Sequence, residues 1–323
     1  ELWGEDKQTR KDRIRERDLD QWIPRRAVNT RSGDGWSLDT GRACGCTDIY
    51  KPAQDSGTEL MSVLSLDILD PESEVAGTSV LAGLGQVYAS PESLYLAVLE
   101  PTWGPWKVND PDKVGTRIHK FDIDGAPAHP TYEASGRVDG WVLNSFSMDE
   151  EDRQFRLATT RETGDDRIPV NAVYVMMQVD QELMVVGQTE DIAPDEDIFA
   201  VRFMGDVGYV VTFHRVEFID PLFTVDLSDP TNPTVKGELK VPGYSTYLHP
   251  MGEDHLLAVG EEDWELQVSL FDVSDLTDPQ LSERLFLDAW GSEAQWDHHA
   301  FNYFPPTESL TLPLSLIHIC RCR

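Results

Sequence analysis

The sequence has few basic residues and lacks any long apolar run. Lysine and arginine number 27 against 58 aspartates and glutamates, which gives a formal net charge of −31 at pH 7. This negative charge repels the phosphates of nucleic acids, whose protein partners depend on lysine and arginine. A helix that spans a bilayer needs about 20 mostly apolar residues in succession, and no such stretch occurs. We therefore expect no nucleic-acid partner and no transmembrane segment.

Cysteine is also scarce. Cys44 and Cys46 are separated by one residue, and Cys320 and Cys322 stand among the last four residues. A Cys-x-Cys pair closes a disulfide with itself only under strain. Each of Cys44 and Cys46 therefore either forms a disulfide with a cysteine elsewhere, as in an exported protein, or remains a buried thiol. Both alternatives stay open. A zinc site here would need two more ligands, and none is near in the sequence.

Local catalytic motifs are missing as well. The chain contains no G-x-S-x-G elbow, no H-E-x-x-H, no phosphate-binding loop and no dinucleotide fingerprint. Any enzymatic site would have to be assembled from residues that lie far apart in the sequence.

A repeat of about 46 to 58 residues runs along most of the chain. The segments TVDLSDPTNPTVKGEL, from Thr224, and LFDVSDLTDPQLSERL, from Leu270, align with a displacement of 46 residues. Weaker copies lie upstream, and in each copy an apolar residue precedes a marker aspartate. The marker aspartates are Asp67, Asp122, Asp180, Asp226 and Asp272. Their spacings are 55, 58, 46 and 46 residues, a length typical of β-propeller repeats.

Each repeat has the pattern of four short strands. The innermost strand is predicted at residues 86–90, 143–148, 199–204, 245–250 and 299–304. A second strand is predicted at residues 94–98, 155–160, 209–213 and 255–260. The third strand ends at the marker aspartate, and a fourth lies around Val75, Val138, Val186 or Val235. This pattern predicts an all-β fold, a β-propeller of four-stranded antiparallel blades.

The marker aspartates have two interpretations. In D-x-S-D-P-T-N-P the aspartate and serine side chains accept and donate hydrogen bonds in a tight turn, and the prolines stop the strand. Calcium binding is the alternative, but calcium takes six to eight oxygen ligands and one turn supplies about three. We favour the turn; no cofactor is evident, and calcium stays possible as a ligand.

The two ends of the chain differ from the repeats. Residues 1–43 are rich in charge and are expected to form a linker or a helical segment, solvated or serving as a docking helix. Residues 44–313 are expected to form the propeller domain. Residues 314–323, LSLIHICRCR, resemble the translated read-through of a sequencing adapter, so we expect this tail to be non-native.

Four segments resemble one protein family. These are residues 135–160, 193–213, 220–250 and 296–305, the last reading WDHHAFNYFP. They are similar, in the same order, to secreted bacterial and archaeal proteins with a C-terminal β-propeller domain, distantly similar to WD-repeat propellers. The resemblance implies a secreted, extracellular or cell-surface location, and no established activity. It also implies an incomplete ring, with about five to six of seven or eight blades in this fragment.

Candidate site residues come from the innermost strands, which line the central channel of a propeller. The alignment of the repeats brings residues from four blades to the channel mouth. These are Asn144, Arg202, His249, Asp297, His298 and His299. Such a ring of polar side chains either binds a ligand or forms a hydrated structural plug. A shared metal ion at His298 and His299 is disfavoured, because neighbours on a strand point to opposite faces.

Two classes of function remain. We favour an extracellular binding or interaction module whose partner is an unknown protein or small ligand. The alternative is an extracellular enzyme with a site assembled at the channel mouth. Exposed aromatic side chains in the channel would favour the binding module. Titratable groups that lie within hydrogen-bond reach of one another and have shifted pKa values would favour the enzyme.

Overall fold

The fold is seen in a computed structural model of the chain. The residues that it describes are 6–33, 35–54, 56–70, 73, 75–100, 114–124, 129–164, 166–213 and 219–315. The expected tail therefore lies outside the described residues apart from Leu314 and Ser315. Ser315 exchanges two backbone hydrogen bonds with Trp290 and Gly291.

Sixteen strands form four consecutive four-stranded blades, antiparallel within each blade. The first comprises β6 (Gln86–Ala89), β7 (Ser93–Leu99), β8 (Gly115–Asp122) and β9 (Thr131–Asp139). The second comprises β10 (Met148–Glu151), β11 (Gln154–Thr163), β12 (Ile168–Val179) and β13 (Glu182–Gln188). The third comprises β14 (Asp197–Met204), β15 (Val207–Phe213), β16 (Ile219–Asp226) and β17 (Thr234–Pro242). The fourth comprises β18 (Tyr244–Met251), β19 (His255–Glu262), β20 (Glu265–Asp272) and β21 (Gln280–Leu287).

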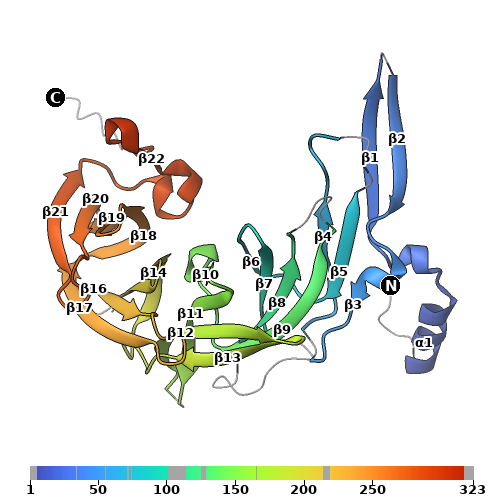
Figure 1. Cartoon of the computed structure of the whole chain (residues 1–323), viewed down its shortest axis with the longest axis horizontal. Helices are drawn as coiled ribbons and strands as arrows, with labels where there is room; N and C mark the ends of the chain where they lie inside the picture. The colour runs from blue at the N-terminus through green and yellow to red at the C-terminus, as the bar shows by residue number, and fades with distance from the viewer. Residues whose placement is uncertain are drawn as a thin grey trace.

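The blades stand side by side in an open arc, with the first strand of each blade on the inner side and the fourth strand on the outer side (Figure 1). The first two blades also share a backbone connection. Glu182 and Leu183 of β13 pair in parallel with Ser135 and Gly136 of β9, which joins the two blades into one eight-stranded sheet. The predicted propeller architecture is therefore confirmed.

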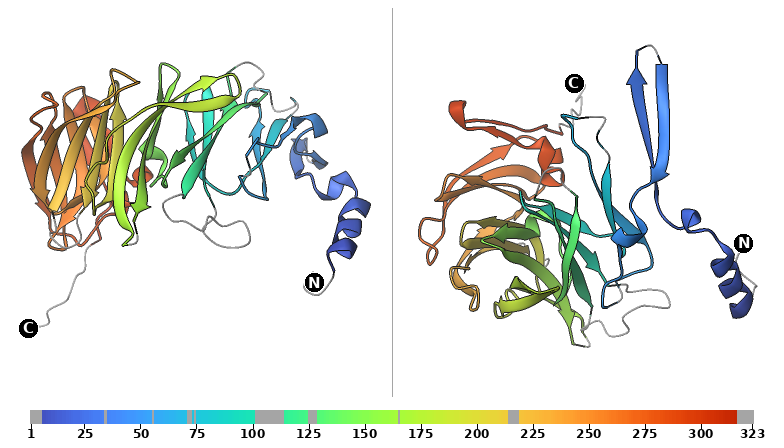
Figure 2. Two further views of the ribbon diagram at one scale, coloured as in Figure 1. Left: turned by 90° about the horizontal axis from the view of Figure 1, so that it is seen from below. Right: turned by 45° about the vertical axis from the view of Figure 1, so that its right-hand side comes forward.

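Further elements flank the blades. On the N-terminal side lie α1 (Lys7–Glu16), the hairpin of β1 (Arg25–Ser32) and β2 (Gly35–Arg42), and a sheet of β3 (Ile49–Tyr50), β5 (Ala76–Leu81) and β4 (Leu60–Ser65). Figure 2 shows α1 projecting away from the blades. On the C-terminal side lie β22 (Asn302–Phe304) and β23 (Ser309–Thr311), with the 3₁₀ turns η5 (Glu293–Gln295) and η6 (His298–Ala300) before them. The β1–β2 hairpin was not expected from the sequence.

The hydrophobic cores lie between neighbouring blades rather than at one centre. Apolar side chains of the first two blades meet in one buried cluster, in which the rings of Tyr95 and Phe155 stack with centroids 3.9 Å apart. Similar clusters join the second blade to the third and the third to the fourth. Because each sheet buries both faces against its neighbours, its strands are rich in apolar residues on both sides.

Four of the five marker aspartates occupy equivalent places, as predicted. Asp122, Asp226 and Asp272 are the last residues of β8, β16 and β20, the third strands of their blades, and Asp180 directly follows β12, the third strand of its blade. Asp67 lies outside these blades and follows β4 of the three-stranded sheet. The turn interpretation is supported by the contacts of Asp226, whose Oδ1 accepts hydrogen bonds from the Ser228 backbone N at 3.0 Å and from its Oγ at 2.6 Å. These bonds hold the pKa of Asp226 below its usual value.

Two innermost strands were placed wrongly. Residues 143–148 were expected as a strand, but η4 (Ser145–Ser147) occupies them and β10 begins only at Met148. Asn144 causes this, because its side chain accepts a hydrogen bond from the Phe146 backbone N and caps the 3₁₀ turn. In residues 299–304 only Asn302–Phe304 form a strand. The Asp297 side chain caps η6 in the same way, by accepting from the His299 backbone N.

Candidate functional site at the inner side of the blades

The aromatic ring of Phe146 is the point at which several predicted site residues meet. Phe146 belongs to η4, which precedes the inner strand of the second blade. The guanidinium carbon of Arg202, on β14, lies 5.1 Å from the centre of the Phe146 ring. The imidazole of His298, on η6, meets the same ring edge-on with centroids 4.8 Å apart. Residues from three separate blade units are therefore brought together at one ring.

His249 joins this group through Tyr247. The Phe146 and Tyr247 rings have centroids 5.5 Å apart, and the Tyr247 hydroxyl lies 3.3 Å from Nδ1 of His249. Burial lowers the pKa of His249, and the positive charge of Arg202 lowers it further. The imidazole of His249 is therefore neutral at pH 7 and available as a hydrogen-bond acceptor or donor.

The other predicted residues lie differently. Asn144 does not face the group with its side chain, which instead positions Phe146 by capping η4. Asp297 and His299 lie beside each other in contact with solvent, and Oδ1 of Asp297 is 2.9 Å from Nδ1 of His299. The expectation that His298 and His299 point apart on a strand is wrong, because both belong to the 3₁₀ turn η6 and their rings have centroids 4.0 Å apart.

A cavity of about 380 Å³ opens beside Phe146 and Arg202. Its other lining residues come from β6, η4, β10 and β14; they are Val87, Tyr88, Ala89, Ser145, Met148, Asp149 and Phe203. The cavity therefore combines aromatic and apolar walls with one guanidinium, one carboxylate and a phenol. Small-molecule sites likewise combine apolar walls with a few polar groups, although here the polar part of the lining is the larger.

The carboxylate in this cavity is already compensated. Asp149 forms an ion pair with Arg156, whose side chain is only 2% exposed and also donates to the Gly205 carbonyl at 2.6 Å. The Tyr88 hydroxyl donates to Oδ1 of Asp149 at 3.3 Å and accepts from the Glu150 backbone N at 3.0 Å. Burial, reinforced by the Asp149 charge, raises the pKa of Tyr88 to about 12. Tyr88 therefore stays protonated as a donor.

Arg202 is not compensated in this way. Every other lysine and arginine of strands β6 to β21 lies within 4.0 Å of a carboxylate oxygen. Within the described residues Arg202 has no such partner, and its Nε is buried without a hydrogen bond. Among the described lysines and arginines of strands β6 to β21, this lack of a carboxylate partner sets Arg202 apart.

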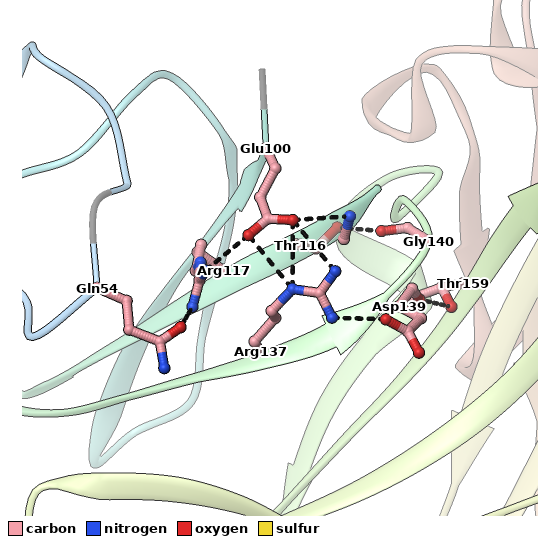
Figure 3. A network of polar contacts seen from close by, with 9 residues as sticks. Gln54, Glu100, Thr116, Arg117, Arg137, Asp139, Gly140 and Thr159 are labelled. Atoms are coloured by element: carbon pink, nitrogen blue, oxygen red, sulfur yellow. Dashed lines mark hydrogen bonds and ion pairs between the residues drawn. The ribbon is translucent and has the colours of Figure 1, made fainter. Parts of the chain in front are cut away.

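Arg117 and Arg137, at the outer end of the first blade, show the usual arrangement (Figure 3). The Glu100 carboxylate lies 2.7 Å from Arg117 and 3.2 Å from Arg137, and Arg137 also pairs with Asp139 at 2.5 Å. Thr116 and Thr159 hold the surrounding backbone by donating to the carbonyls of Gly140 and Asp139. The two guanidiniums and two carboxylates balance one another, so this network stabilises the blade without leaving charge for a ligand.

Sequence reasoning missed Phe146, Tyr88 and Asp149. Tyr88 lies within a predicted innermost strand, so the repeat alignment placed it correctly but gave no reason to select it. Phe146 was obscured because residues 143–148 were expected to form a regular strand, and Asp149 was overlooked because it lies just after that predicted strand. The N-S pair at Asn144 and Ser145, a common turn signal, could have revealed the 3₁₀ turn.

Comparison with known proteins places this architecture in a family. A model of the family described as "Beta propeller domain" matches residues 4–320. The chain belongs to this β-propeller family. Within the described part of this β-propeller, no helix is sufficiently long and apolar to cross a membrane.

Two archaeal relatives of the β-propeller are described as uncharacterised. The protein of Methanocaldococcus jannaschii is 45% identical over 190 residues, and that of Archaeoglobus fulgidus is 45% identical over 188 residues. Each match covers 58% of this chain but 28% of the relative, so the matched part is little more than a quarter of either relative's length.

Two solved structures were also compared with the β-propeller. A hypothetical selenium-binding protein of Sulfolobus tokodaii has a TM-score of 0.38 at 7% identity, covering 71% of this chain and 74% of that one. A periplasmic gluconolactonase of Pseudomonas aeruginosa has a TM-score of 0.36 at 11% identity, covering 80% of this chain and 97% of that one. Likenesses of this degree give no indication of ligand or activity.

Proposed function

We propose that this β-propeller is an extracellular binding module whose cavity at Phe146 and Arg202 takes a small ligand with an acidic group. The observation that carries the proposal is the guanidinium of Arg202, which lacks a carboxylate partner among the described residues. A buried hydrogen-bond donor without a partner lowers the stability of the fold by about 1–3 kcal/mol. A ligand carboxylate would satisfy it.

The remaining walls suit the rest of such a ligand. Arginine pairs with carboxylates through two parallel hydrogen bonds, which fixes the orientation of the bound group. Phe146 and Val87 offer apolar contact, and Tyr88 and Asp149 offer a hydroxyl and a carboxylate to ligand hydroxyl groups. Because Arg156 already balances Asp149, Arg202 provides the net positive charge of the cavity. The proposed ligand class is therefore a small organic acid with an apolar or hydroxylated body.

The test uses a series of straight-chain monocarboxylates and their primary amides as probes. We expect the acids, but not the amides, to raise the midpoint of thermal unfolding and to give a measurable dissociation constant by calorimetry. Arg202→Met should weaken acid binding by about 10-fold to 100-fold, because a charge-assisted hydrogen bond contributes about 1.5–3 kcal/mol. Lys240→Met, which removes an exposed ion pair with Glu238, serves as the control.

Two results would contradict the proposal. The first is that no acid in the series binds. The second is that Arg202→Met binds the acids as well as the unchanged protein does, in which case Arg202 only stacks on Phe146.

The extracellular location is a separate part of the proposal. It is supported by the resemblance of the four segments, among them WDHHAFNYFP, to a secreted family. Fractionation of a source organism with an antibody to this chain would test it. Detection in the culture medium or on the cell surface is expected, and detection only inside the cell would overturn it.

A further inference from the structure

We propose that Asp297, His298 and His299 form a binding site for a divalent transition-metal ion at the 3₁₀ turn η6. This inference does not depend on the ligand class proposed for Arg202. Each of the three residues offers one donor atom, and these atoms all lie within 4.8 Å of one another.

The 3₁₀ turn η6 brings these three consecutive residues onto one side. Asp297 caps the turn: its Oδ1 accepts from the His299 backbone N at 3.0 Å and lies 2.9 Å from Nδ1 of His299. The rings of His298 and His299 are tilted by 34° with centroids 4.0 Å apart. A strand would have sent the two imidazoles to opposite faces, whereas the turn keeps them adjacent.

The surrounding residues orient the His298 side chain, and the side chains of His299 and Asp297 are open to solvent. His298 is oriented by its edge-on contact with Phe146, whose ring centroid is 4.8 Å away. The side chains of His299 and Asp297 are 78% and 47% exposed, so a hydrated ion reaches them without any opening of the fold. Metal–ligand distances near 2.0 Å require donor atoms about 3.3 Å apart, so binding requires rotation of these side chains from their present separations of up to 4.8 Å.

The donor types select the metal class. Two imidazoles and one carboxylate suit zinc, copper, nickel or cobalt, whereas calcium requires six to eight oxygen ligands. Three protein ligands leave at least one coordination position for water or another ligand. Imidazole and carboxylate groups bind a metal ion only in their deprotonated forms, so binding is expected to weaken as the pH falls. The net charge of −31 raises the local concentration of cations.

The experiment measures zinc binding to the full chain, after treatment with a chelator, by calorimetry at pH 7.5 and at pH 5.5. We expect a zinc ion bound at this site at pH 7.5 and much weaker binding at pH 5.5. His298→Ala and His299→Ala should each weaken binding about tenfold or more, since even the partners of metal ligands contribute that much.

Two variants serve as controls. Asp297→Asn keeps a good cap for η6 but removes the anionic ligand, so zinc binding should weaken while thermal unfolding stays unchanged. His129→Ala removes an exposed histidine outside the site and should bind zinc normally.

The proposal is overturned if zinc binds equally to the unchanged protein and to both histidine variants, which would place the ion elsewhere, for example at the thiols of Cys44 and Cys46. It is also overturned if no binding in the micromolar range is found. Neither outcome bears on Arg202, because the binding of the organic acids is measured without metal.

Discussion

At the scale of single residues, the chain buries several polar side chains, and some of their polar atoms lack a hydrogen-bond partner within the described residues. His119 on β8 is fully buried; its Nδ1 lies 3.0 Å from the Tyr132 hydroxyl, while its Nε2 has no hydrogen-bond partner. Burial, aided by the charge of Arg117, lowers the pKa of His119 to about 4. The folded protein therefore holds this imidazole neutral at pH values where an exposed histidine would be charged.

His119 should make stability depend on pH. In the unfolded chain a histidine has a pKa of about 6.5, so between that value and about 4 the unfolded state binds a proton that the folded state does not. The contribution of His119 to the free energy of unfolding, about 3 kcal/mol, is fully present above pH 6.5 and is lost as the pH falls towards 4. Denaturant unfolding at several pH values should show this loss reduced in His119→Gln and unchanged in His129→Gln. Equal pH profiles for all three proteins would contradict the assignment.

The candidate site was predictable in part at this scale. Arg202, His249 and His298 were selected because the repeat aligns the inner strands, and the structure brings them together around Phe146 and Tyr247. The sequence could not show that Arg202 lacks a carboxylate partner. That property depends on which of 58 acidic residues lie close in space, and no spacing along the chain encodes it.

At the scale of elements, the turn after the third strand does more than end a strand. A Cβ added to Gly237 on β17 would lie 2.4 Å from the Leu276 carbonyl oxygen and 2.8 Å from Pro279 of the next blade. Gly187 on β13 is related in the same way to Pro230 and Pro233. Each such turn therefore packs against a glycine on the outer strand of the preceding blade.

Replacing Gly237 should loosen the contact between the third and fourth blades. Gly237→Ala places a methyl group against backbone atoms that must move, and overpacking of this kind costs about 1–3 kcal/mol. Gly41→Ala is the control, because the nearest atom to its added Cβ is in the Arg26 side chain at 3.7 Å. Chemical denaturation of both variants measures the difference. Equal stabilities would mean that the turn shifts at no cost.

The elements themselves were largely predictable. The second strands fell where the apolar runs placed them, as at β7 and β15, because a strand buried on both faces has a nearly continuous apolar sequence. The errors at η4 and η6 arose because a single capping side chain, Asn144 or Asp297, overrides the strand preference of its neighbours. The β1–β2 hairpin was missed because its residues are mostly exposed and carry no apolar alternation.

At the scale of the whole molecule, the charge imbalance dominates. With a net charge of −31, the folded chain brings many carboxylates close together, and their repulsion opposes compaction. Exposed ion pairs such as that of Lys240 with Glu238 contribute less than about 1 kcal/mol each to stability. Salt that screens these attractive pairs therefore destabilises the fold only slightly.

Added salt should therefore stabilise the fold. Sodium chloride shortens the Debye length from about 30 Å at 0.01 M to about 3 Å at 1 M and screens the repulsion. At pH 7 the midpoint of thermal unfolding should rise over this range. Near pH 4.4, the isoelectric point, the effect should vanish because the net charge is close to zero. A midpoint that falls with salt at pH 7 would show that specific ion pairs outweigh the general repulsion.

The parallel pairing between β13 and β9 has a mechanical consequence. Across this junction the first two blades are linked by main-chain hydrogen bonds as well as by apolar contact, whereas the third and fourth blades are separate four-stranded sheets. The backbone pairing of Glu182 with Ser135 and of Leu183 with Gly136 adds to the apolar contact at this junction. We therefore expect the first two blades to separate from each other less readily under load than the later blades do.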